Sequence, residues 1–215
     1  MTYLQLVNSV LARLRESSVA TVSSTSYSTL IGKFVNDSKR QVEDSFNWDA
    51  LRTTLTITTV SGTSTYTVTG SGKFPKGIAV NDTTNQGKLL NVPIQWILNQ
   101  QQLTTTSNAI PSYYAWNGTD GTDSKVELFP TPNGTFSLKF NLYVPQANLS
   151  ADSDVLTIPA AEAVEMGAYA RALVERGEDG GLNSSEAYAL FKSILNDQIS
   201  LESTRFSEND EWVAV

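Results

Sequence analysis

Residues 53–70 read TTLTITTVSGTSTYTVTG, and this stretch decides the fold because eleven of its eighteen residues are Thr or Ser. Leu55, Ile57 and Val68 alternate with these polar residues, which is the period expected of a half-buried β-strand. A turn pair, Ser61-Gly62, interrupts the alternation. The pattern therefore predicts a β-hairpin, in preference to a disordered Thr-rich linker.

The sequence before this stretch has helical spacing. Apolar residues recur on one face of two predicted helices, at residues 2–16 and 27–48. Thr2 and Gln5 have the form of a capping box at the start of the first helix. Charged residues of the second helix, including Lys39 and Glu43, are placed on faces other than its apolar stripe. Because each helix is apolar on one side only, the two are expected to pack as an antiparallel hairpin.

Helical spacing returns at residues 159–206. Pro159 stands where a first helical position is expected, and Gly177 ends the first of two predicted helices. The second begins near residue 183, where Asn183 and Glu186 again have the form of a capping box. Since neither helix pair can bury its apolar stripe alone, the two ends of the chain are expected to meet.

The strand pattern continues between the two helical regions. Turn dipeptides such as Asn117-Gly118 and Asn133-Gly134 separate short alternating segments, and a short helix is expected to open at Pro93. Expected strands lie around residues 78–80, 113–116, 125–129 and 136–143.

These patterns predict an α+β protein. Residues 1–52 and 146–206 are expected to form one discontinuous domain, an antiparallel helical bundle built from the N- and C-terminal helix pairs. Residues 53–145 are expected to form an inserted antiparallel β-sandwich or barrel. Residues 207–215 are expected to be a C-terminal tail.

The composition excludes several kinds of site. The chain has no cysteine and no histidine, which excludes disulfides, thiolate catalysis, imidazole metal ligands and Ser-His-Asp systems. We therefore expect no enzymatic activity, no cofactor and no metal. Because the sequence lacks a run of about 18 apolar residues, no membrane-spanning helix is expected.

The net charge of −7 is concentrated in the last third of the chain. Residues 146–215 hold 4 Lys or Arg against 13 Asp or Glu, whereas residues 1–145 hold 11 against 9. Tight, sequence-independent DNA binding needs clustered positive charge, so the chain is not expected to grip DNA. An acidic surface is instead suited to a wall to which DNA does not adhere.

Asp152 and Asp154 lie near Glu162 and Glu165 in the sequence, and such oxygen ligands can bind a hard cation such as Ca²⁺. Their spacing lacks the glycine and the distal Glu of a calcium loop. Carboxylates near a helix start also interact favourably with the helix dipole. A structural role at the start of the helix is the preferred interpretation, and paired carboxylates for glycoside hydrolysis are a weaker alternative.

The acidic C-terminal tail ends in Trp212-Val213-Ala214-Val215. Two interpretations remain open for it. It is either a frayed chain end or a peptide that docks on a partner with Trp212 as its anchor.

Several short segments occur in an order that is typical of one family. They are Trp48-Asp49-Ala50-Leu51, Ile110-Pro111-Ser112-Tyr113-Tyr114, Leu128-Phe129-Pro130-Thr131-Pro132, Leu138 to Pro145, Leu149 to Pro159, and Ala168-Tyr169-Ala170. In this order they resemble the head-to-tail adaptor, or connector, proteins of tailed bacteriophages, specifically the tail-tubular-protein-A-like family. The resemblance covers most of the chain.

The resemblance implies a non-enzymatic structural protein of the virion, located in the phage neck and assembled in the host cytoplasm. It implies a homo-oligomeric ring of twelve copies that connects the portal protein to a tail or nozzle protein. DNA would pass through the ring without specific binding, and no membrane would be involved. The portal-contact candidates are Phe206, Trp212, Val213 and Val215. The channel-lining candidates are Glu162, Glu165, Glu175, Glu178 and Asp179.

A carbohydrate-binding module on a helical stem, from a tail fibre or baseplate, is the alternative function. Tyr113, Tyr114 and Trp116 offer rings that can stack on sugars, although their alternation places at least one of them in the core. A trimer in place of a ring would favour this alternative.

Overall fold

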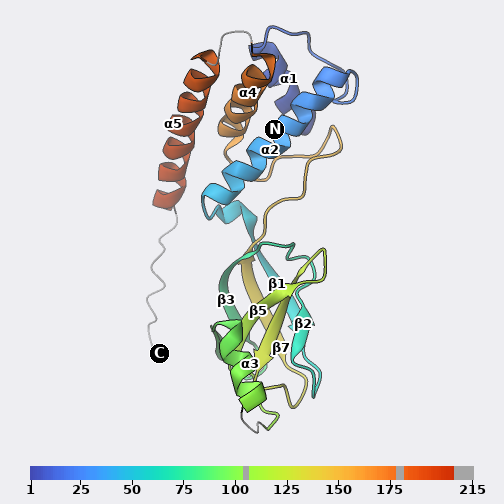
Figure 1. Ribbon diagram of the computed structural model, residues 1–215, viewed down its shortest axis with the longest axis vertical. Helices are drawn as coiled ribbons and strands as arrows, with labels where there is room; N and C mark the ends of the chain where they lie inside the picture. The colour runs from blue at the N-terminus through green and yellow to red at the C-terminus, as the bar shows by residue number, and fades with distance from the viewer. Residues whose placement is uncertain (104–106, 178–181, 206–215) are drawn as a thin grey trace. The chain divides into compact units, whose positions relative to one another are not determined.

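The computed structural model describes residues 1–103, 107–177 and 182–205 (Figure 1). The chain divides into two compact units. Met1–Ala50 and Gln146–Val215 form the helical unit, and Leu51–Pro145 form the barrel unit. The protein is α+β, and a short 3-10 helix at Asp49–Leu51 precedes the first strand.

The helical unit contains α1 (Tyr3–Arg13), α2 (Ser26–Ser45), α4 (Ala161–Arg176) and α5 (Leu182–Arg205). Helix α4 lies between α2 and α5 and also contacts α1 (Figure 1). The predicted capping box is confirmed, because the Gln5 N–H donates to Thr2 Oγ1 at 3.3 Å and the Thr2 N–H donates to Gln5 Oε1 at 2.9 Å. The capping box predicted at Asn183 is wrong, since α5 begins one residue earlier and Asn183 lies inside it.

Gly167 marks the closest approach of α4 to its neighbours. A Cβ at this position would collide with Ser38 Oγ of α2 and would lie 3.1 Å from the Phe191 ring of α5. The small residues of α4 therefore allow two other helices to approach one helix at the same level. The fully buried side chains around them include Val35, Val42, Val164, Ala168, Ala172 and Phe191.

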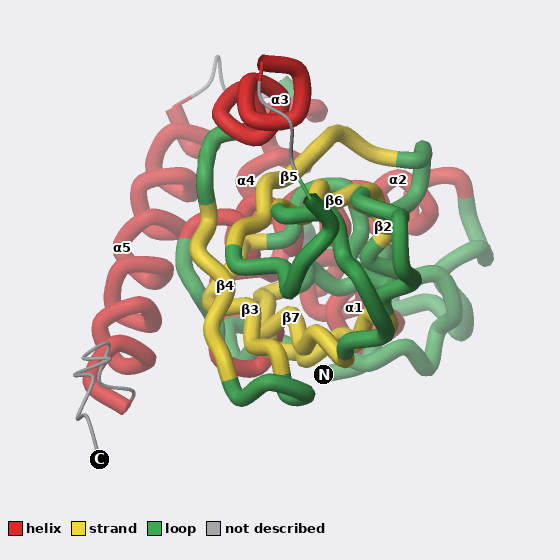
Figure 2. The backbone as a smooth tube through the Cα atoms, turned by 90° about the horizontal axis from the view of Figure 1, so that it is seen from below, coloured by secondary structure: helices red, strands yellow, loops and turns green. Residues whose placement is uncertain are grey.

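The barrel unit contains β1 (Arg52–Thr58), β2 (Thr65–Thr67), β3 (Lys76–Asp82), β4 (Gly87–Asn91), α3 (Ile94–Leu103), β5 (Tyr113–Thr119), β6 (Ser124–Phe129) and β7 (Ser137–Tyr143). The strands form one sheet in the order β1-β7-β3-β4-β5-β6-β2. This sheet curls into a nearly closed, barrel-like form (Figure 2). A buried apolar cluster fills it, with residues from β1, β3, β4, β5, β6 and β7: Ile57, Val80, Leu89, Tyr114, Val126, Leu128, Leu138, Phe140 and Leu142.

The sheet is mixed, so the prediction of an antiparallel β domain is wrong in one pair. Strands β4 and β5 run parallel, with Leu90 opposite Tyr113 and Asn91 opposite Tyr114. Parallel neighbours need a crossover connection. The segment between these strands supplies it and contains α3, the short helix expected at Pro93.

The hairpin predicted for residues 53–70 is also wrong. Both halves are strands, but β1 pairs with β7 and β2 pairs with β6. They therefore stand at the two ends of the strand order. Alternation shows that a segment is a strand with one buried face, but it does not choose the partner strand.

The barrel unit begins and ends in neighbouring strands. Arg52 of β1 is opposite Tyr143 of β7, and the Val144 N–H donates to the Leu51 carbonyl at 3.0 Å. The points where the chain enters and leaves this unit are thus hydrogen-bonded to each other. None of the helices in the described parts of the chain has the length and apolar character needed to cross a membrane.

Candidate functional site

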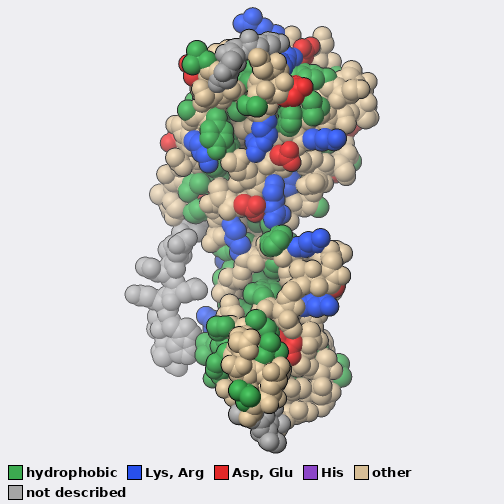
Figure 3. Space-filling model, in the orientation of Figure 1, with side chains coloured by type: hydrophobic (Ala, Val, Ile, Leu, Met, Phe, Trp, Pro, Cys, Tyr) green, Lys and Arg blue, Asp and Glu red, His purple; other side chains and the backbone are tan. Residues whose placement is uncertain are grey.

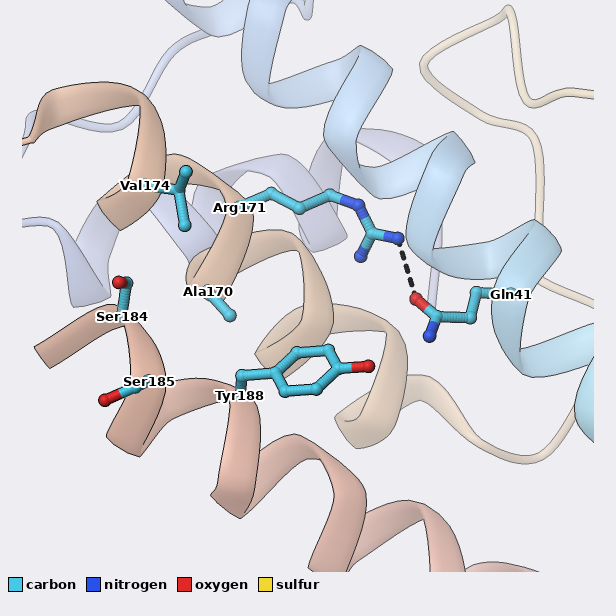
Figure 4. A pocket seen from close by; sticks show the side chains of 7 residues that line it. All are labelled: Gln41, Ala170, Arg171, Val174, Ser184, Ser185 and Tyr188. Atoms are coloured by element: carbon cyan, nitrogen blue, oxygen red, sulfur yellow. Dashed lines mark hydrogen bonds between the residues drawn. The ribbon is translucent and has the colours of Figure 1, made fainter. Parts of the chain in front are cut away.

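A groove of about 460 Å³ lies between α2, α4 and α5 (Figure 4). The guanidinium of Arg171 extends from α4 towards α2, where its Nη2 donates to Gln41 Oε1 at 2.7 Å, while its Nη1 donates to the Gly167 carbonyl at 3.1 Å. The ring of Tyr188 extends into the groove from α5. Ala170, Val174, Ser184 and Ser185 complete the lining. The groove thus combines a cation held by neutral acceptors with an aromatic ring and aliphatic side chains.

The surface of α5 carries large apolar side chains beyond those it buries. Its buried residues follow one stripe, which consists of Ser184, Ala187, Phe191, Leu195 and Glu202. Leu190 is 49% exposed and Leu201 is 68% exposed, and neither lies on that stripe. Exposed apolar residues gathered along one element are typical of an interaction surface.

The channel-lining candidates of α4 divide into two groups by burial. Glu162 and Glu175 are exposed. Glu165 is only 6% exposed, and its carboxylate faces Arg13 of α1 at 3.6 Å, so in the helical unit it acts between helices. Glu178 and Asp179 lie outside the described residues, as do the portal-contact candidates Phe206, Trp212, Val213 and Val215 and the whole tail 207–215.

Residues 146–160 connect the barrel unit to α4, and we name them the returning segment. Asp152 and Asp154 hold this segment in place. Asp152 Oδ1 accepts the Val22 N–H at 2.9 Å, and Asp154 Oδ2 accepts the N–H groups of Ser150 and Ala151 at 2.7 and 2.8 Å. These backbone bonds hold the pKa of Asp154 below its ordinary value. Among the residues that the structure describes, no three acidic side chains gather as metal ligands would. Both aspartate side chains therefore hold backbone N–H groups of loops, and neither caps the start of α4, where the sequence predicted their role.

Asn36 holds the same returning segment from α2. Its side chain donates through Nδ2 to the Leu149 carbonyl at 3.0 Å and accepts the Leu149 N–H through Oδ1 at 2.8 Å. One amide group thereby satisfies both backbone groups of a residue more than a hundred positions away.

The prediction that Lys39 and Glu43 lie on faces of α2 other than its buried stripe is wrong. Both side chains are 0% exposed, and Lys39 Nζ lies 3.1 and 3.2 Å from the two carboxylate oxygens of Glu43. Nζ also donates to the Gln146 carbonyl at 2.7 Å. Burial lowers the pKa of Lys39 and raises that of Glu43, and their mutual attraction opposes both shifts. The pair anchors the first residue of the returning segment.

Glu127 of β6 is the corresponding polar centre of the barrel unit. It accepts hydrogen bonds from neutral side chains on four elements or loops, namely Ser64 Oγ at 2.5 Å, Thr65 Oγ1 at 2.6 Å, Gln101 Nε2 at 3.0 Å and Asn117 Nδ2 at 3.3 Å. Burial raises the pKa of Glu127, but these four donors together outweigh burial and hold the pKa below its ordinary value. The carboxylate thus ties α3 and the edge strand β2 to the sheet.

The aromatic residues of β5 pack within the barrel unit. Tyr114 is 4% exposed and lies in the core, as its alternation with Tyr113 and Trp116 required. Tyr113 packs 4.9 Å from Trp96 of α3, and Trp116 packs 6.3 Å from Phe140. These rings are therefore not a free platform for sugars. Hydrophobic side chains instead gather on the surface over α3 (Figure 3), where Leu103 is exposed.

Sequence reasoning missed the residues that these sites depend on. Arg171 and Tyr188 were not singled out, since a lone arginine and tyrosine on different helices have no motif. Lys39 and Glu43 did carry a signal, because they stand four residues apart and flank Ser38 and Val42 of the apolar stripe. Glu127 carried a weaker one, as an acidic residue between two apolar neighbours of a strand.

The described residues present a groove and exposed apolar side chains, which are typical of a protein that contacts other chains. The buried carboxylates join elements of the fold, and the groove lies between helices. Exposed apolar side chains occur both on helices, as at Leu201, and outside them, as at Phe74. The family model of the SU10 adaptor protein matches residues 1–211, and the chain belongs to this family of bacteriophage adaptors. Such adaptors are structural components of the virion. A search of curated proteins finds no match to the chain.

Proposed function

We propose that this chain forms a ring of twelve copies in the phage neck, connecting the portal protein to a tail or nozzle protein. The observation that carries this proposal is the match to an adaptor family over nearly the whole chain. The proposal includes the narrower likeness to tail-tubular-protein-A-like subunits and assembly in the host cytoplasm. It assigns no reaction to the protein.

The charge distribution supports a role beside DNA. Glu162 and Glu175 are exposed on α4, and they belong to the region that carries the negative balance of the chain. We assign these two, with Glu178 and Asp179, to the wall of the DNA channel. Negative side chains there repel the phosphate backbone, so the DNA passes without adhering. Glu165 is left out of this assignment because its carboxylate is buried.

The division into two units supports two sets of contacts. We assign the helices, acting as an antiparallel bundle, and the tail 207–215 to the portal and the channel. In this assignment Phe206, Trp212, Val213 and Val215 contact the portal. The barrel unit, with its low charge, is assigned to neighbouring copies or to the tail of the phage.

Mass photometry of the purified chain, with and without its portal protein, tests the proposal. We expect a multi-copy species that forms alone or upon addition of the portal. A chain that stays monomeric and binds no portal would overturn the proposal. Removal of residues 207–215 should weaken portal binding while thermal unfolding of the helical unit stays the same, and unchanged binding would remove the tail from the portal contact.

A further inference from the structure

Helix α5 presents two different flanks, one on each side of its buried stripe. An α-helix turns by roughly 100° per residue. On this geometry one side of the stripe, which we name the leucine flank, carries Glu186, Leu190, Ile194, Asp197 and Leu201. The other side adjoins the groove, and we name it the groove flank. It carries Ser185, Tyr188, Lys192 and Ile199.

The leucine flank is apolar and acidic. Leu190 and Leu201 are exposed, Ile194 is half-buried, and the carboxylates of Glu186 and Asp197 are exposed beside them. A flank of this composition is costly to leave in water, and its charged residues between Glu186 and Leu201 are both negative.

The groove flank is aromatic and basic. Lys192 Nζ lies 5.6 Å from the ring centres of both Tyr188 and Phe191, and the Arg171 guanidinium lines the adjoining groove. The two hydrogen bonds of Arg171 in the helical unit go to neutral oxygens, so its positive charge is available to an incoming carboxylate.

We propose that the occupant of the groove is a second copy of this chain, whose leucine flank seats against the groove flank. This inference rests on the proposed ring and names its subunit interface. Glu186 and Asp197 of one copy face Arg171 and Lys192 of the next, while leucine side chains enter beside Tyr188. The charges are complementary and each flank supplies the apolar area that the other lacks.

The geometry makes this contact heterologous, because each copy uses one flank towards one neighbour and the opposite flank towards another. Heterologous contacts repeat from copy to copy and close into a ring when the rotation between neighbours allows it. A two-fold dimer would instead need the same patch on both partners. The placement of opposite charges on opposite flanks of one helix therefore favours a ring over a dimer.

Charge reversal tests the interface. One variant carries Glu186→Lys and Asp197→Lys, and the second carries Arg171→Glu and Lys192→Glu. Either variant alone brings like charges together and should lower the assembled fraction at least about tenfold. An equimolar mixture should assemble again, because the reversed flank of each variant complements the other variant. Lys33→Glu and Asp37→Lys, exposed positions of α2, provide matched controls that should assemble like the wild type.

The assembled fraction is measured by mass photometry, with the portal protein present and absent, and far-UV circular dichroism checks that each variant is folded. The single change Lys192→Glu keeps the test valid if the loss of Arg171 unfolds the helical unit. Variants that assemble like the wild type, or a mixture that stays disassembled, would overturn the interface while leaving the ring in place. Wild-type protein that stays monomeric with portal present would overturn the ring as well.

Discussion

The buried pair of Lys39 and Glu43 allows a quantitative test, in which Glu43→Leu removes the carboxylate and leaves an ammonium group with no opposite charge. At 3.1 Å and an effective dielectric constant of about 20, the lost attraction is about 5 kcal/mol. Lys39 can avoid this by losing its proton, but deprotonating a lysine of ordinary pKa at neutral pH costs about 4.6 kcal/mol. Both routes predict a loss of about 3–5 kcal/mol in the free energy of unfolding.

Urea unfolding of the full chain at neutral pH, followed by far-UV circular dichroism, measures this loss, because most of the described helical residues lie in the helical unit. Asp44→Leu is the matched control. It breaks the exposed pair of Arg40 and Asp44, which has the same spacing in the same helix at 3.0 Å, and should cost at most about 1 kcal/mol.

The double variant Lys39→Met/Glu43→Leu removes both charges and fills the same buried space with apolar side chains, so it distinguishes the effect of an unpaired charge from the effect of changed packing. It should be more stable than Glu43→Leu, since no unpaired charge remains. It should stay below the wild type by about 1–3 kcal/mol, because the Gln146 backbone loses its side-chain partners. If Glu43→Leu costs no more than Asp44→Leu, or if the double variant is no more stable than Glu43→Leu, the electrostatic reasoning is refuted.

Three further changes test other parts of the fold. Hydrogen bonds hold the pKa of Glu127 below its ordinary value. At a pH above that ordinary pKa the ionised carboxylate therefore stabilises the fold, and this stabilisation is lost as the pH falls through the folded-state pKa. Between about pH 5 and pH 3 the wild type should therefore lose more unfolding free energy than Glu127→Gln. Gly167→Ala should lower the unfolding free energy by about 1–3 kcal/mol in thermal melts, because the new methyl group meets Ser38 and Phe191. Asn36→Ala should reduce the hydrogen-exchange protection of the Leu149 amide at least tenfold, corresponding to about 1.4 kcal/mol or more.

Each of these outcomes has a clear contrary result. Equal pH dependence of Glu127→Gln and the wild type would show that the carboxylate is not stabilised by its neutral donors. A Gly167→Ala variant as stable as the wild type would show that α4 and its neighbours have room to separate. The control for Asn36→Ala is Asn196→Ala on the exposed side of α5. Equal protection of the Leu149 amide in both variants would show that the Asn36 side chain does not hold the Leu149 backbone in place.

The parts of the fold that could be predicted from sequence depend on local chemistry. Thr2 and Gln5 satisfy each other's backbone N–H groups within one turn, so this helix start depends only on neighbouring residues. The same spacing at Asn183 and Glu186, however, does not mark the start of α5. Pro93 opens a helix because its missing N–H costs nothing there. The alternation at Leu55 and Ile57 identifies a strand because it reports one buried face.

The parts that could not be predicted depend on distant partners. The partner of β1 is β7, and paired residues such as Leu55 and Phe140 are about 85 positions apart in the sequence, so no local signal distinguishes β7 from β2 as the partner. Lys39 is buried because the Gln146 carbonyl meets it there, 107 positions along the chain. The groove is formed by Arg171 and Tyr188 only after α2, α4 and α5 have packed. The sequence contains no catalytic motif from which a function could be predicted. The resemblance to phage adaptor proteins is confirmed, and the narrower resemblance to the tail-tubular-protein-A-like family stays a prediction.

The hydrogen bond between Val144 and Leu51 has a consequence for how such a protein can change. Because the chain enters and leaves the barrel unit on neighbouring strands, the two cut points are one strand spacing apart, about 5 Å. A loop of a few residues could bridge them, so the helical unit can lose, keep or exchange the inserted unit without moving its own ends. The barrel unit can therefore be replaced as a whole, and a lineage of such proteins can change it while the helical unit remains the same.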